Sequence, residues 1–213
     1  MIGIVVPAHN EEALIGACLA ALAAQTVPVR VVVVLDDCTD ATAAQCHGVE
    51  TITVRHRCVG AARRAGTEAV LRGGDPATTW IATTDADTVV PPDWVARQLA
   101  LDADLVLGTA VPDDCPMLPA WAARHVLADG HRHVHGANLG IRGDAYLRVG
   151  GWPALRTGED VELVRRAAAA GLTVARTAAI PVRTSARTVG RAPHGFASYL
   201  AALARQRPAS APV

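Results

Sequence analysis

The chain has 213 residues, enough for one domain with a full hydrophobic core. Its 20 acidic side chains balance 20 basic side chains, all of them arginine, so the formal net charge is zero. A neutral chain lacks the positive charge that draws proteins to nucleic acids or anionic membranes, and a chain without lysine has neither a P-loop lysine nor a Schiff-base lysine.

The first half of the chain alternates apolar runs typical of buried strands with segments typical of helices. Asn10 is predicted to cap the first helix. The predicted strands are 2–6, 30–35, 51–54, 79–84 and 104–109, and the predicted helices are 10–25, 40–47, 60–71 and 93–100. This alternation predicts an α/β fold with a Rossmann-like, mostly parallel sheet covered by helices on both faces.

The second half is less regular. We expect helices at 118–127, 160–170 and 195–206, an extended segment at 131–141, and two short strands within 173–184. No repeat or linker divides the chain, so a single domain, 1–213, is predicted. Residues 207–213 are polar and proline-rich, which predicts a flexible tail.

Two composition signals bear on the cellular compartment. No window of about 18 apolar residues occurs, and no basic leader precedes the first apolar run, so neither a transmembrane segment nor a signal peptide is expected. The five cysteines include no Cys-x-x-Cys pair, which favours free thiols in the cytoplasm.

Carboxylates follow two of the predicted strands. Asp85 and Asp87 come after the apolar run 80–82, and Asp36 and Asp37 come directly after the predicted strand 30–35. Two carboxylates spaced by two residues point to the same side of the chain, and their oxygens suit Mg²⁺ or Mn²⁺ shared with a diphosphate. Because the carboxyl ends of parallel strands meet at one edge, we expect all four at one site.

Five motifs, in this order and spacing, resemble the family 2 glycosyltransferases of the GT-A fold. They are Val5-Val6-Pro7-Ala8-His9-Asn10-Glu11-Glu12, Asp36-Asp37-Cys38-Thr39-Asp40, Gly60-Ala61-Ala62-Arg63-Arg64-Ala65-Gly66, Thr84-Asp85-Ala86-Asp87 and Gly158-Glu159-Asp160. The resemblance covers about residues 2–185. It implies a nucleotide-sugar-binding half at about 1–110 and a smaller acceptor-side half at about 111–206.

The resemblance implies an inverting enzyme that moves a sugar from a nucleotide-diphosphate donor to a hydroxyl acceptor with Mg²⁺ or Mn²⁺, UDP being favoured over GDP. Asp87 would bind the metal, and Asp85 would reach the ribose or the metal. Asp160 matches the base that takes the acceptor proton, and Glu159 would orient it or hold the acceptor. The other residues implied to border the nucleotide sugar are Pro7, Ala8, Glu11, Asp36, Asp37 and Arg63.

The same resemblance implies an acceptor region and a further metal ligand. His194 matches a late histidine that binds the metal in some GT-A enzymes. The implied acceptor-side residues are His135, Gly136, Ala137, Asn138 and Trp152.

Several structural interpretations compete with these roles. Asp36 and Asp37 suit a turn, Glu159 and Asp160 suit the first turn of a helix, and Arg63 suits a surface position. The alternating histidines 131, 133 and 135, with His125 nearby, have a spacing that could bind zinc.

Two other functions fit parts of the pattern. One is a catalytically silent nucleotide-sugar-binding subunit. The other is a sugar nucleotidyltransferase, which normally needs a basic glycine-rich loop where this chain has the acidic stretch 10–12. The apolar face of the last helix, 196–203, could pack in the core, or dock on a second copy or a membrane surface.

Overall fold

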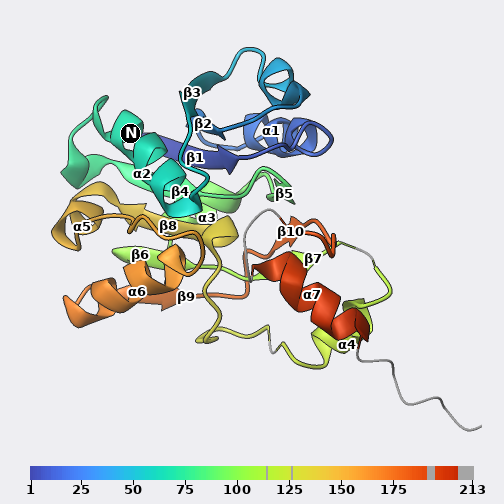
Figure 1. Ribbon diagram of the computed structural model, residues 1–213. Coiled ribbons are helices and arrows are strands. Elements are labelled where there is room, and N and C mark those ends of the chain that lie inside the picture. Colours follow the sequence, from blue (N-terminus) through green and yellow to red (C-terminus); the bar gives the residue numbers. More distant parts are fainter. Residues whose placement is uncertain (114, 126, 191–194, 206–213) are drawn as a thin grey trace, which may run out of the picture.

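The computed structural model describes residues 1–113, 115–125, 127–190 and 195–205. Seven strands form the main sheet, in the order β3-β2-β1-β4-β8-β6-β9 (Figure 1). Their bounds are β1 Ile2–Ala8, β2 Arg30–Asp36, β3 Glu50–Val54, β4 Trp80–Thr83, β6 Leu105–Leu107, β8 Leu139–Arg142 and β9 Val174–Arg176. The strands predicted in the first half of the chain are confirmed.

The main sheet is mostly parallel, with one reversal. β8 runs antiparallel to both of its neighbours, β4 and β6, while the remaining adjacent pairs are parallel. Leu139, the first residue of β8, therefore pairs with Thr83, the last residue of β4. The reversal brings the residues before β8 to the edge where β1, β2 and β4 end.

A second, three-stranded sheet was not predicted. It has the order β5-β10-β7, with β5 Thr88–Val89, β7 Ala110–Pro112 and β10 Val182–Thr184. Thr184 pairs with Thr88 across β10 and β5, and their hydroxyls are 3.0 Å apart. This pairing brings the chain after β10 alongside Asp87, although about a hundred residues separate them in sequence.

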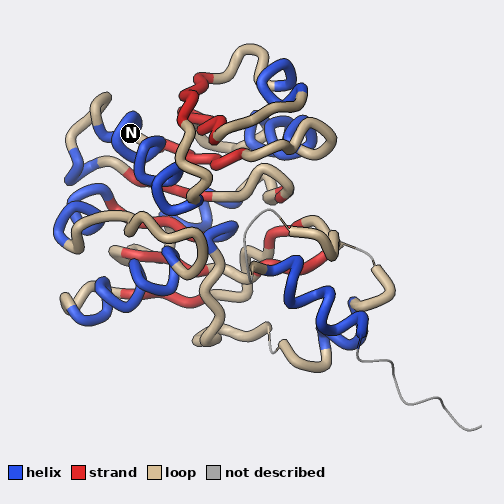
Figure 2. The backbone as a smooth tube through the Cα atoms, in the orientation of Figure 1, coloured by secondary structure: helices blue, strands red, loops and turns tan. Residues whose placement is uncertain are grey.

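Helices cover both faces of the main sheet (Figure 2). α1 and α3 pack on one face, and α2, α5 and α6 pack on the other. The bounds are α1 Ile15–Ala23, α2 Val59–Leu71, α3 Trp94–Leu99, α4 Leu118–Ala122, α5 Gly143–Arg148, α6 Glu159–Ala169 and α7 Phe196–Arg205, with 3₁₀ turns η1 Ala41–Gln45, η2 Pro76–Thr78 and η3 Gly136–Asn138. The predicted α/β fold, covered on two faces, is confirmed.

Alternation along β1 explains why this strand needs helices on both sides. Ile4 and Val6 point into the core shared with α1, and Val5 points into the core shared with α2. All three side chains are fully buried. Successive side chains of a strand face opposite sides of the sheet, so a continuous apolar run such as 2–6 must be covered twice.

The predicted start of the first helix is wrong. α1 begins at Ile15, and Asn10 has a left-handed backbone with φ of 55°. The Asn10 side chain instead accepts a hydrogen bond from the Thr39 backbone N–H at 2.8 Å, tying the β1–α1 turn to the β2–η1 loop. Asparagine tolerates this backbone conformation better than most residues, so a turn replaced the expected cap.

The second half departs further from the expected elements. Only 139–141 of the predicted extended segment 131–141 lies in a strand, β8; α4 ends at Ala122 rather than near 127, and α5 was not predicted. α6 matches its expected helix closely. Residue 206 and the predicted tail, 207–213, lie outside the described residues.

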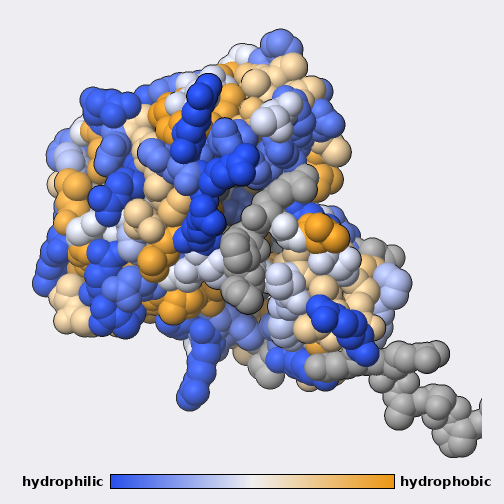
Figure 3. Space-filling view, viewed as in Figure 1, coloured by the Kyte–Doolittle hydropathy of each residue, from blue (hydrophilic) through white to orange (hydrophobic). Residues whose placement is uncertain are grey.

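The C-terminal helix packs within the protein. Ala197, Leu200 and Leu203 of α7 are buried, and the two leucines form a small core with Trp121 of α4. Figure 1 shows α4 and α7 together, beside the main sheet, and Figure 3 shows apolar side chains scattered among hydrophilic ones on this side of the molecule. Within the described ranges, no helix combines the length and apolar character needed to cross a membrane.

Gly66 tests how closely α2 packs on the sheet. A Cβ added there would lie 2.4 Å from Cγ1 of Val5 and 2.9 Å from Cγ2 of Val34. We expect Gly66→Ala to destabilise the protein by about 1–3 kcal/mol, because the extra methyl group overpacks the core. Urea-induced unfolding measures this change.

Gly16→Ala is the matched control, since a Cβ there meets nothing within 4 Å and Gly16 is also in a helix. It should raise stability by up to about 1 kcal/mol through helix propensity. Equal effects of the two substitutions would contradict the close packing of α2.

Candidate active site

A cavity of about 730 Å³ opens at the carboxyl edge of β1 and β4. This volume lies within the usual range of small-molecule sites. Most of the residues predicted for the site line this cavity, namely Pro7, Ala8, Glu11, Asp36, Arg63, Asp85, Asp87, His135, Gly136, Ala137, Glu159 and Asp160. Residues from distant parts of the sequence thus meet where the carboxyl ends of the parallel strands were expected to form a site.

Two of the predicted acceptor-side residues are structural supports. Asn138 is fully buried and donates hydrogen bonds to the carbonyls of Thr109 and Ile180, at 2.9 and 2.7 Å. Trp152 is also fully buried, and its carbonyl accepts a hydrogen bond from Arg64. Neither side chain lines the cavity. Predicted metal ligand His194 lies outside the described residues.

Asp36 and Asp37 have different roles in the structure. The Asp36 carboxylate is buried and accepts three backbone hydrogen bonds, from His56 at 2.6 Å and from Arg57 and Cys58 at 2.9 Å. Asp37 is more exposed and pairs with Arg57, whose guanidinium lowers the pKa of this carboxyl. Asp36 therefore holds the loop that leads into α2, and through it brings Arg57 and Cys58 to the cavity.

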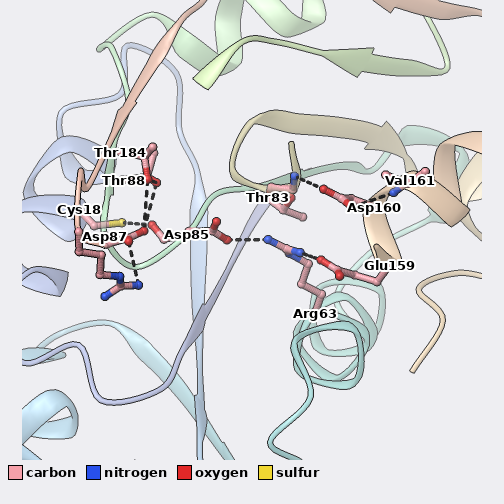
Figure 4. Close-up of polar contacts among 12 residues, drawn as sticks. Cys18, Arg63, Thr83, Asp85, Asp87, Thr88, Glu159, Asp160, Val161 and Thr184 are labelled. Carbon is pink, nitrogen blue, oxygen red and sulfur yellow. Dashed lines mark hydrogen bonds and ion pairs between the residues drawn. The ribbon is translucent and has the colours of Figure 1, made fainter. Parts of the chain in front are cut away.

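Arg63 is a buried hub rather than a surface charge. Only 2% of the residue is exposed. Its Nη2 lies 2.5 Å from Oδ1 of Asp85, and its Nη1 pairs with Glu159, as Figure 4 shows. Burial alone would lower the pKa of Arg63, but the charges of Asp85 and Glu159 outweigh burial and raise it. The guanidinium thus joins the end of β4 to the start of α6.

Asp87 lies deeper than Asp85, with 10% of its side chain exposed. Burial, with the charge of Asp85 beside it, raises the pKa of Asp87 to about 6. Its Oδ2 lies 2.9 Å from Nη2 of Arg187, and the same guanidinium pairs with Glu11 at 2.7 Å. No sequence motif pointed to Arg187, because β10 pairing with β5 is what brings it here.

Asp85 and Asp87 fit a divalent cation that also binds a substrate phosphate. The pKa of Asp87 is raised by burial and by the charge of Asp85, and a bound cation would stabilise the ionised carboxylate against both effects. Nowhere in the described part of the chain do three or more His, Cys, Asp or Glu side chains gather into a metal site. Mg²⁺ commonly takes one or two protein carboxylates and completes its coordination with phosphate oxygens and water.

Asp160 is held from two sides at the N-terminus of α6. Its Oδ2 accepts a hydrogen bond from the Gly136 N–H, and its Oδ1 accepts one from the Val161 N–H, both at 2.8 Å. Thr83, at the end of β4, donates to the Gly136 carbonyl at 2.6 Å. The reversal of β8 is what places Gly136 between these two elements, and Figure 4 shows Asp160 beside Thr83.

Four histidines, 125, 131, 133 and 135, form a histidine stack. His133 lies 5.0 Å from His125, 5.7 Å from His131 and 5.9 Å from His135, measured between ring centroids, with the rings close to parallel. Nδ1 of His125 and Nε2 of His131 each lie within hydrogen-bonding distance of a backbone carbonyl, of Trp121 and Thr177. Together with the lack of a three-ligand cluster among the described residues, these contacts argue against the zinc hypothesis.

The histidine stack borders one end of the cavity. His125 and His135 line it together with Phe196 and Tyr199 of α7. Phe196 meets His135 edge-on at 6.4 Å, and Tyr199 meets His125 edge-on at 5.5 Å. In a chain with one Phe and two Tyr, this concentration of rings marks a distinct wall. Of its residues, the sequence assigned only His135 to the acceptor side, and it did not point to Phe196 or Tyr199.

The histidine stack makes stability sensitive to acid. Burial, with the neighbouring His133, lowers the pKa of His135 from 6.5 to about 4. A depressed pKa stabilises the folded state above pH 6.5, and this contribution is lost as pH falls from 6.5 through 4. The free energy of unfolding should therefore fall between pH 7.5 and 4 in both proteins, and the fall should be about 1–3 kcal/mol smaller in His135→Gln than in the parent.

Urea-induced unfolding at a series of pH values measures this difference. His47→Gln is the control, since His47 is exposed and lies outside the histidine stack. If His135→Gln kept the parent's full loss of stability in acid, the acid sensitivity would originate elsewhere.

The family model described as "Glycosyl transferase family 2" matches residues 3–143. The chain belongs to this family. The match runs from β1 to the first residue of α5, so this family 2 glycosyltransferase has Asp85 and Asp87 inside the matched region, and Glu159 and Asp160 beyond it. No curated protein matches the chain.

Structure comparison finds similar folds among solved structures of S. aureus TarS. The 1–349 fragment in complex with UDP has a TM-score of 0.66 at 15% identity, over 86% of this chain and 60% of that one. Its complex with UDP-GlcNAc gives 0.66 at 15%, over 92% and 61%. The structure titled TarS without residue limits gives 0.68 at 16%, over 86% and 36%. The glycosyltransferase thus spans about 60% of the TarS fragments, and its predicted GT-A fold is confirmed.

Proposed function

We propose that this glycosyltransferase is an inverting, metal-dependent enzyme that transfers a sugar from a UDP-sugar to a hydroxyl acceptor. One observation carries the proposal: Asp85, Asp87 and Asp160 line the same cavity. In Figure 4, Asp87 and Asp160 lie on either side of the Asp85–Arg63 pair. Inversion needs charge neutralisation at the leaving group and a base on the opposite side of the sugar, and the two sets of carboxylates suit these tasks.

The donor half, about residues 1–110, would hold the nucleotide diphosphate between the ends of β1 and β4. A divalent cation on Asp85 and Asp87 would neutralise the charge that develops on the departing diphosphate. UDP is favoured because the two TarS complexes contain UDP and UDP-GlcNAc. Pro7, Ala8 and Glu11, which line the cavity at the end of β1, would border the nucleoside.

Asp160 would take the proton from the acceptor hydroxyl as that oxygen attacks the sugar. Its oxygens are oriented by the N–H groups of Gly136 and Val161, and the N-terminus of α6 favours negative charge there. Glu159 points to Arg63 instead, so its role would be to fix the start of α6. This assignment separates the two neighbouring carboxylates into a base and an anchor.

The acceptor half, about residues 111–206, would bind its substrate against the wall formed by the histidine stack and α7. The low pKa of His135 keeps its ring neutral at pH 7, and flat neutral rings suit the apolar face of a sugar or another ring. The five cysteines are free thiols, which favours a reducing compartment such as the cytoplasm.

No observation favours either rival function. A silent binding subunit would have no need to orient Asp160 by two backbone N–H groups. A sugar nucleotidyltransferase would need a basic glycine-rich loop after β1, and this turn carries Glu11 in the cavity.

Asp87→Asn tests the metal site. Mn²⁺ should tighten UDP binding in the parent. In Asp87→Asn we expect this factor to be smaller by at least about tenfold, or about 1.4 kcal/mol, because the amide is a poor ligand for this ion. The folded-state pKa of Asp87, near 6, lies above its ordinary value of 3.8. Burial thus disfavours the charged Asp87 above pH 6, whereas its replacement leaves the Arg187 guanidinium with Glu11 alone, so a thermal melt at pH 7.5 in EDTA is needed to show that the variant is folded.

Calorimetric titration of UDP with and without Mn²⁺ measures the first effect. Asp113→Asn, at an exposed carboxylate paired with Arg183, is the control and should behave as the parent. Unchanged Mn²⁺ dependence in Asp87→Asn would remove Asp87 from the metal site.

Asp160→Asn tests the base. Turnover should fall at least about 10²-fold while UDP binding is retained, since the amide keeps the shape but cannot take a proton. UDP release from UDP-GlcNAc with water as the acceptor gives a measurement that needs no knowledge of the natural acceptor. If Asp160→Asn releases UDP at the parent rate, Asp160 is not the base, and Glu159 becomes the candidate. If the variant no longer binds UDP, Asp160 has a structural role instead.

A further inference from the structure

Arg187 lines the cavity but has no role in the proposed activity. It lies just after β10, and its guanidinium bridges two carboxylates from distant segments. Nη1 is 2.7 Å from Oε2 of Glu11, in the turn after β1, and Nη2 is 2.9 Å from Oδ2 of Asp87. The exposed fraction of the Arg187 side chain is 25%, against 6% for Glu11 and 10% for Asp87.

We infer that Arg187 is a positioning residue that occupies Asp87 until the nucleotide arrives, so that binding of the divalent cation depends on the nucleotide. This inference rests on the proposed function, because it assumes that Asp87 is a metal ligand. The inferred role sets an order for the binding steps. A cation without nucleotide meets Asp87 while Arg187 is still paired with it, whereas a cation that arrives with the nucleotide meets Asp87 after Arg187 has moved to the phosphate.

The distribution of charge supports this order. Asp85 is paired with Arg63, and Asp87 and Glu11 are paired with Arg187. A cation that arrives alone must displace Arg187 from a nearly buried carboxylate, which leaves the guanidinium, itself a quarter exposed, with Glu11 as its carboxylate partner. Losing one partner of a partly buried ion pair costs free energy, so the cation alone should bind more weakly than it does with the nucleotide.

A nucleoside diphosphate removes this penalty. Its phosphate oxygens accept hydrogen bonds from a guanidinium in the same forked geometry as a carboxylate. Arg187 can therefore exchange Asp87 for a phosphate while the cation takes its place on Asp87. Each charge then keeps a partner, and the affinities of the cation and the nucleotide become coupled to the same extent in both directions.

The local backbone suits such an exchange. The Ser185 N–H donates to the Asp87 carbonyl at 3.1 Å, so the loop stays beside Asp87. Arg187 follows two residues later, in a segment without helix or strand, and its partly exposed side chain lines the cavity. The guanidinium can move by side-chain rotation while the backbone remains anchored.

The experiment is a titration of Mn²⁺ followed by the electron paramagnetic resonance of the free ion, with and without UDP. For the parent we expect weak Mn²⁺ binding alone and binding about five- to 150-fold tighter with UDP, the usual range of coupling between sites. Arg187→Gln should bind Mn²⁺ alone about tenfold more tightly than the parent, and UDP should then add much less.

Three further variants make the result specific. Arg187→Lys keeps the positive charge and should resemble the parent more than the glutamine variant does. Arg183→Gln removes an exposed arginine on the neighbouring strand, paired with Asp113, and should leave the Mn²⁺ titration unchanged. Asp87→Asn should lose the Mn²⁺ binding, which identifies the titrated site.

The outcomes separate this inference from the proposed function. If the parent binds no Mn²⁺ even with UDP, the metal dependence itself is wrong. If the parent shows UDP-dependent binding and Arg187→Gln titrates as the parent does, with a circular dichroism spectrum that shows it is folded, then only the role of Arg187 is overturned. Tighter Mn²⁺ binding in Arg187→Gln without UDP supports the inference.

Discussion

The bridge that Arg63 makes between Asp85 and Glu159 is the interaction on which the rest of the site depends. A buried guanidinium between two carboxylates is stable only while both partners stay in place, because removing either one leaves a buried charge unpaired. The bridge therefore fixes the distance between the end of β4 and the start of α6. Asp87 and Asp160 each lie close in sequence to one end of it, so the geometry of the reaction is set by a residue that need not touch the transferred sugar.

The order of the strands makes this bridge possible. β8 returns antiparallel between β4 and β6, so the η3 turn lies at the same edge as the donor carboxylates. From there the Gly136 N–H reaches Asp160, and Thr83 reaches the Gly136 carbonyl. If β8 ran parallel to β4, a crossover connection would have to return the chain to the opposite edge of the sheet before β8 begins. The η3 turn, which directly precedes β8, would then lie at that opposite edge.

The strands and site carboxylates of the first half could be predicted because simple local rules govern them. Val5 and its neighbours form an apolar run that only a buried strand satisfies, and Asp85 and Asp87 follow such a run directly. The remaining features depend on contacts between distant segments. Arg187 lies in no recognisable motif, and Asn10 would have been a good cap had Thr39 not bound its side chain. The two short strands predicted within 173–184 are β9 and β10, whereas β5 and β7, with two and three residues, are too short for periodicity to reveal.

The position of β8 also determines how the chain can come apart. Residues 1–110 cannot be released intact by a cut near residue 110, because β4 would lose the neighbour on one of its edges and expose unpaired N–H and C=O groups along it. The segment after the cut would lose Thr83 as the partner of the Gly136 carbonyl at the same moment. The two segments are thus complementary fragments rather than modules: they should unfold in one cooperative transition, and evolution could not exchange the second segment without also replacing a strand at the centre of the sheet.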